Sequence, residues 1–139
     1  MVLAHEDDEN GHPYWYARII GIFHTLVNHP SSSESVQMDF LWVRWYGRDM
    51  DHRAGWKAKH LHRVGFVDGN DPLAFGFLDP SLVVRGCHLI PAFEHSRTKD
   101  LLPPSLARLN DENNEDWIFY YVNMYVQSNS FRLSFDFFI

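Results

Sequence analysis

The chain has 139 residues, of which 45% are hydrophobic and 16% aromatic, and its formal net charge is −6. This length suits one domain with a proper core. The acidic balance excludes a protein held on nucleic acid by bulk charge alone, and the single cysteine, Cys87, excludes an internal disulfide partner. Because no apolar stretch is long enough to span a membrane and the first residues do not resemble a signal peptide, we expect a cytoplasmic location, with a nuclear one left open. We also expect a monomer.

The first half of the chain predicts strands joined by polar turns. Residues 1–12 are expected to be a flexible acidic lead before a single mostly-β domain over 13–139. Aromatic and β-branched residues predict a strand, or a bent pair, over 14–27, with a bulge at Gly21. Further elements expected here are a loop over 28–35, a strand over 36–48, a short strand over 64–67, a turn over 68–72 and a capped turn at 79–81.

The second half predicts a strand pair over 82–93, broken at Gly86 and Pro91, then one or two helical turns within 97–109. Residues 115–126 suit either a helix or a strand, and the strand is favoured. A terminal strand is expected over 131–139. Together these elements predict a mostly-β fold with a minor α component: a small curled sheet or barrel of five to six short strands with one or two short helices.

Side chains alternate along a strand, so the segment 40–48 has two faces. Leu41, Val43 and Trp45 form a natural core face. The other face holds Phe40, Trp42, Arg44, Tyr46 and Arg48, and the first strand offers a similar set in Tyr14, Tyr16 and Arg18. Rings interleaved with guanidinium groups suit a single-stranded nucleic acid, whose bases stack while its phosphates are neutralised. The plainer alternative is that these rings cover the second face of the sheet, with arginine stems lying across them.

A second set of candidates follows the turn after Pro91. Glu94 could stabilise an oxocarbenium-like sugar and Arg97 could polarise a departing base, with His88 or His95 assisting. The alternative is a solvated loop with a weak ion pair. His52, His60 and His62 lack the accompanying ligands of a zinc site, so no metal and no cofactor is expected. Cys87 and His88 point to opposite faces of a strand, so an inert thiol is favoured over a nucleophile.

Several long strings resemble a known family: WYARIIGIFH (15–24), FLWVRWYGRD (40–49), FGFLDPSLVVRGCHLIPAF (75–93), SRTKDLL (96–102) and EDWIFYYVNMYV (115–126). They are similar to a domain near the C-terminus of large proteins of mushroom-forming fungi that are linked to Kyakuja–Dileera–Zisupton (Plavaka-type) transposons. The resemblance covers residues 13–126 and departs over 127–139 and at Glu94-His95. In that family the domain lies away from the nuclease core, so the resemblance implies no transposase activity.

Two shorter resemblances lead to two functional hypotheses. The size and the inventory of rings, Glu and Arg resemble the small ribosome-inactivating proteins of edible mushrooms, which implies an rRNA N-glycosylase acting on the sarcin–ricin loop of the ribosome. The string LWVRWYGRD is similar to a strand of bromo-adjacent-homology domains, which implies a non-enzymatic reader of nucleic acid or of a chromatin peptide. An orphan structural domain, with all rings in its core, is the third possibility.

Overall fold

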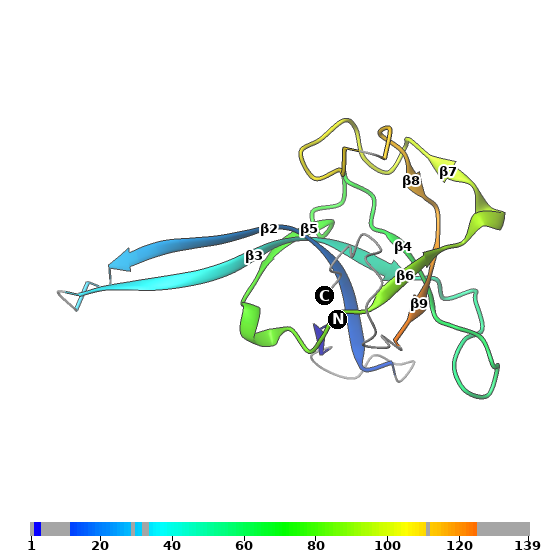
Figure 1. The fold of residues 1–139 in the computed structure, drawn as a ribbon, viewed down its shortest axis with the longest axis horizontal. Helices are drawn as coiled ribbons and strands as arrows, with labels where there is room; N and C mark the ends of the chain where they lie inside the picture. The colour runs from blue at the N-terminus through cyan, green and yellow to red at the C-terminus, as the bar shows by residue number, and fades with distance from the viewer. Residues whose placement is uncertain (1, 4–11, 29, 32–33, 111, 125–139) are drawn as a thin grey trace, which may run out of the picture.

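The computed structural model describes residues 2–3, 12–28, 30–31, 34–110 and 112–124, and these residues form a mostly-β protein (Figure 1). In chain order the elements are β1 (Val2–Leu3), β2 (Tyr14–Asn28), β3 (Ser35–Arg48), β4 (Arg63–Phe66), β5 (Phe75–Leu78), η1 (Pro80–Leu82), β6 (His88–Pro91), η2 (Phe93–His95), β7 (Arg97–Thr98), β8 (Asp116–Trp117) and β9 (Tyr120–Asn123).

Most of the strands belong to one antiparallel sheet. Its order is β1-β2-β3-β4-β9-β6, and β5 pairs with β3. A separate two-stranded sheet joins β7 to β8. The large sheet curls without closing, so the predicted curled sheet is confirmed and the barrel alternative is not.

Strands β2 and β3 match the strands predicted over 14–27 and 36–48 to within one residue at each end. They pair from Tyr16 and Tyr46 to Asn28 and Ser35, with a register shift between Ile19 and Gly21 that confirms the predicted bulge. The distal parts of both strands project from the rest of the protein as a two-stranded arm, which we define as residues 21–28 and 35–40 (Figure 1). The proximal parts enter the core.

The core consists of two clusters on opposite faces of β3. The first contains Tyr16, Tyr46, Val64, Phe66, Cys87, Leu89, Tyr120 and Val122. The second contains Ala17, Leu41, Val43 and Leu78. Because alternate side chains of β3 enter different clusters, the proximal part of this strand is covered on both faces. The expected open aromatic and basic face on 40–48 is therefore wrong for the proximal part of the strand.

The turns follow local chemistry. Asp79 Oδ1 accepts a hydrogen bond of 2.8 Å from the Ser81 amide and caps η1, as predicted. The helical turns predicted within 97–109 do not form, and this segment contains only β7 and turns. Pro103 and Pro104 lack the backbone N–H groups that a helix needs there. The strand favoured over 115–126 is confirmed by β8 and β9, whereas 82–93 contains only one strand, β6. Residues 4–11 and the strand expected over 131–139 lie outside the described residues.

Candidate ligand-binding face

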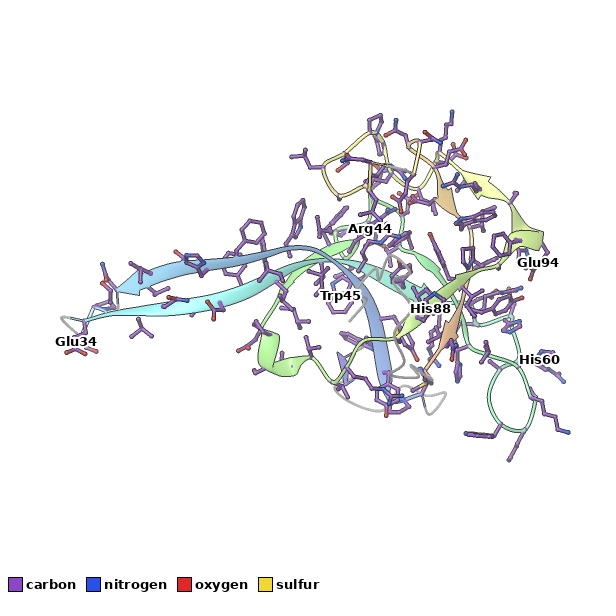
Figure 2. The ribbon with its side chains drawn as sticks, viewed as in Figure 1. Glu34, Arg44, Trp45, His60, His88 and Glu94 are labelled. Atoms are coloured by element: carbon purple, nitrogen blue, oxygen red, sulfur yellow. The ribbon has the colours of Figure 1, made fainter. Side chains whose placement is uncertain are left out.

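Arg44, predicted to contact phosphate, lies in the core and has no exposed surface. Its guanidinium donates hydrogen bonds of 3.0 and 2.9 Å to Asp116, and it lies 3.8 Å from the ring centroid of Phe66. Arg108 forms a further ion pair of 2.9 Å with Asp116. Figure 2 shows Arg44 between the arm and the other strands. This charge serves the fold and is not available to a ligand.

Arg18 is likewise buried in an ion pair. It donates a 2.6 Å hydrogen bond to Glu112 and lies 4.7 Å from the centroid of the same Phe66 ring, with 5% of its surface exposed. The acids late in the chain therefore neutralise the arginines of the first two long strands. A phosphate-binding role for Arg18 or Arg44 does not fit this arrangement, because a buried charge pair leaves no face open to a nucleic acid.

The predicted aromatic platform is also divided. Tyr16 and Tyr46 are buried in the first core cluster, and burial raises the pKa of both hydroxyl groups. Tyr14, Trp42 and Arg48 are half-buried. Tyr14 packs against the first core cluster, and Trp42 lies 6.1 Å from Phe75 between ring centroids. These residues do not form one continuous stacking surface.

The predicted catalytic residues lie elsewhere. Glu94 is in η2 and Arg97 begins β7, whereas His88 begins β6 opposite Asn123. His88 is the first residue of β6 and Glu94 lies beyond the last, so the two lie apart from one another (Figure 2). Glu94 and Arg97, by contrast, both contact a row of rings that the sequence analysis did not identify as a surface.

That row comes from the end of the described chain. Trp117, Phe119 and Tyr121 are half-buried, as is Ile118 between the first two, whereas Asp116, Tyr120 and Val122 are buried. Phe93 of η2 is 69% exposed and meets Trp117 edge to face, with centroids 5.1 Å apart and ring planes at 82°. We call Phe93, Trp117, Phe119 and Tyr121 the aromatic face.

Gly65 allows these segments to approach closely. A Cβ at this position would lie 2.5 Å from the Ile118 carbonyl oxygen and 3.4 Å from the Phe119 ring. Only glycine has no Cβ, so β4 can pass against the segment that carries the rings. A cavity of about 460 Å³ beside it is lined in part by Phe119, Arg48, Asp49 and Asp100.

Arg63 organises the charges at one end of the aromatic face. Its Nε donates a 2.7 Å hydrogen bond to Asp49, and the central carbon of its guanidinium group lies 4.5 Å from the Phe119 ring centroid. A terminal nitrogen donates a 2.6 Å hydrogen bond to His95 Nε2. Since guanidinium only donates, this nitrogen of His95 must be the unprotonated acceptor. The His95 ring lies edge-on to Phe119 at 5.1 Å.

The other cations of this region also have carboxylate partners. Arg97 lies 5.4 Å from the Trp117 centroid and 3.8 Å from a carboxylate oxygen of Glu115. Lys99 lies 3.8 Å from the second oxygen of the same carboxylate. The face therefore already holds cations on two of its rings, and their charges are matched by acids.

Glu94 differs from these acids. Its side chain is 55% exposed and accepts a 2.5 Å hydrogen bond from the Tyr121 hydroxyl, and its carboxylate lies 3.7 Å from His95 Nε2. The hydrogen bond from Tyr121 lowers the pKa of Glu94 and, in return, raises the pKa of Tyr121. Glu94 is therefore an ionised, accessible carboxylate held by the hydroxyl group of Tyr121.

Period-two alternation in the string DWIFYYV was the signal that could have revealed these rings, because Trp117, Phe119 and Tyr121 occupy every second position. Phe93 had no comparable signal, since its exposure depends on where η2 packs.

Together, fold and site define an open, curled antiparallel sheet with a lateral aromatic and acidic face. No family model, curated protein or solved structure matches the chain. Within the described ranges, no three His, Cys, Asp or Glu side chains converge to hold a metal ion. The same residues include no helix with the length and apolar character needed to cross a membrane.

Proposed function

We propose that this domain is a non-enzymatic reader that binds a peptide segment rich in lysine or arginine, such as those of chromatin proteins, on its aromatic face. The observation that carries the proposal is Glu94: an ionised, half-exposed carboxylate held by Tyr121, one residue along the chain from Phe93, whose exposed ring packs against Trp117. Ring faces attract ammonium and guanidinium groups, and a carboxylate beside them adds a charge-assisted hydrogen bond.

The charge distribution supports a basic ligand over a nucleic acid. The net charge of −6 favours a cationic partner. Arg18 and Arg44 are buried in ion pairs, and Arg63 and Arg97 have carboxylate partners near the face. A phosphate backbone would have to displace these acids, whereas a lysine side chain would need only to approach Glu94.

Binding of a fluorescently labelled lysine-rich peptide tests the proposal, with fluorescence anisotropy as the readout. The same peptide with every lysine acetylated keeps its length and loses its charge. We expect acetylation to weaken binding by at least about tenfold, because the ammonium groups are then absent. A single-stranded RNA of matched length represents the alternative class of ligand, a nucleic acid, and is measured in the same assay. Tighter binding of the RNA than of the lysine peptide would overturn the proposal.

A second candidate is the rRNA N-glycosylase, with the ribosome as its partner in the cytoplasm. Its support is that Glu94 and Arg97 both contact the aromatic face, with Glu94 ionised as stabilisation of a sugar cation requires. Ribosomes would be incubated with the protein, and their RNA treated with acidic aniline. A single new fragment from the 3′ end of the large rRNA, absent with Glu94→Gln, would establish this activity. No fragment at high protein concentration would exclude it.

A further inference from the structure

The arm carries a second surface, unrelated to the aromatic face. Residues paired across two antiparallel strands share a face. The pairs Phe23 with Phe40, Thr25 with Met38, and Val27 with Val36 therefore lie on one side of the arm. Phe40 stacks on Phe23 and meets Phe77 of β5 edge to face, both at 5.5 Å between centroids. We call this set, with Phe77 included, the apolar arm face.

The two sides of the arm differ in polarity. The opposite side contains hydrogen bonds from Ser35 to Asn28 at 2.5 Å and from Gln37 to Asp39 at 2.9 Å, together with the apolar residues Ile22 and Leu26. The apolar arm face contains no charged residue, and Thr25 is its one polar member. Its side chains are nevertheless open to solvent: Phe77 is 74%, Val36 64%, Met38 54%, Phe23 44% and Val27 39% exposed.

A surface of this kind requires a cover. A two-stranded hairpin alone is only marginally stable in water, and among the described residues no third strand pairs with the arm beyond Leu41 and Ile22. At roughly 150–200 Å² for a fully exposed large side chain, these five exposed side chains present about 410–550 Å² per copy, so two copies would bury about 800–1,100 Å². The upper end of this range reaches the roughly 1,000 Å² that a specific interface needs, so a weak dimer is expected.

We propose that two copies of this chain associate through their apolar arm faces. None of the members of this face is charged, although Asp39 and Asp79 line a cavity together with Val27, Val36 and Met38. An identical apolar face matches it in chemistry and size. Two such ribbons would pack face to face about a two-fold axis, as the sheets of a sandwich do at about 10 Å separation. The sequence alone favoured a monomer, because it did not reveal that the arm extends beyond the core.

Sedimentation equilibrium over a range of protein concentrations tests the proposal. We expect a mass that rises from 16.4 kDa toward twice that value with concentration. Val36→Glu and Met38→Glu each place a charge on the face of both copies, so each should raise the dimer dissociation constant by at least about tenfold. Leu106→Glu is the matched control: Leu106 is 93% exposed outside the arm, and its substitution should not change association.

Far-UV circular dichroism checks that each variant is folded. A wild-type protein that remains monomeric at every concentration would overturn the proposal, and so would a dimer that Val36→Glu, Met38→Glu and Leu106→Glu leave equally stable. Co-sedimentation with neutral phosphatidylcholine vesicles distinguishes another occupant. A monomer that binds these vesicles through the arm would replace the second copy with a lipid surface.

Discussion

Arg44 and Asp116 are joined by two hydrogen bonds, of 3.0 and 2.9 Å, although they lie 72 positions apart in the chain and neither side chain is exposed. The pair links β3 to β8, and Arg108 contributes a second cation to the same carboxylate. The predicted nucleic-acid contact is thus part of a buried charge network that connects the long strands to the segment carrying the aromatic face.

Replacing Asp116 with Asn should destabilise the protein strongly. Arg44 and Arg108 would keep their charges in the core without their carboxylate, and breaking a buried pair from one side costs about 3–5 kcal/mol. Urea denaturation followed by fluorescence measures the free energy of unfolding. Glu115→Gln is the control, because Glu115, the residue before Asp116, is 33% exposed and its ion pairs should contribute less than about 1 kcal/mol. Equal losses in the two variants would contradict the buried network.

Gly65→Ala should distort the aromatic face and lower stability. The new Cβ would lie 2.5 Å from the backbone oxygen of Ile118, so a strand must shift. We expect a loss of about 1–3 kcal/mol, as for overpacking elsewhere, together with weaker peptide binding. Gly47→Ala is a suitable control, because its nearest neighbour would be a Val67 methyl group at 3.9 Å. A fully stable Gly65→Ala protein would show that this close approach is not required.

Stability should decrease as the pH falls from 7 to 5, in part through His62. Burial, with smaller effects of Arg48 and His52, lowers the pKa of His62 in the folded protein below its ordinary 6.5. The unfolded chain therefore binds a proton at a higher pH than the folded one. The contribution is present above pH 6.5 and is lost as the pH falls toward the folded pKa. Thermal denaturation of the His62→Gln variant should show a shallower decrease than the wild type. Parallel curves would exclude this contribution.

Glu94→Gln should lower the pKa of Tyr121 toward its ordinary value. The hydrogen bond to Glu94 is the main cause of the raised Tyr121 pKa, and removal of the carboxylate charge weakens it. The difference in ultraviolet absorbance between wild type and variant during an alkaline titration isolates this tyrosine from the others. An unchanged titration would separate Glu94 from the aromatic face.

Two exposed phenylalanines should separate ligand binding from association. Phe93→Ala should weaken binding of the lysine-rich peptide by about three- to thirtyfold, the range of a cation–π contact. It should leave the dimer dissociation constant unchanged. Phe77→Ala should weaken the dimer and leave peptide binding unchanged, because Phe77 lies on the apolar arm face. Anisotropy and sedimentation equilibrium measure the two properties. If either variant changed both, the two surfaces would not be independent.

Local chemistry determined much of the fold. The strands around 14–28 and 35–48, the bulge at Gly21 and the Asp79 cap could be predicted, because β-branched and aromatic runs, a missing Cβ and an aspartate side chain act on their own neighbours in the chain. Glu94 and Arg97 could also be proposed from residue type, although which rings they contact could not.

The tertiary structure decided which side chains reach solvent. Alternation places Arg44 and Val43 on opposite faces of β3, but it does not indicate that later segments cover both faces. Asp116 reaches Arg44, and Glu112 reaches Arg18, only after the sheet curls. Long-range packing thus buried four of the residues predicted to bind a ligand: Tyr16, Tyr46, Arg18 and Arg44. It left Phe93 and Glu94 exposed and Tyr121 half-buried, because burial depends on contacts between residues far apart in the chain.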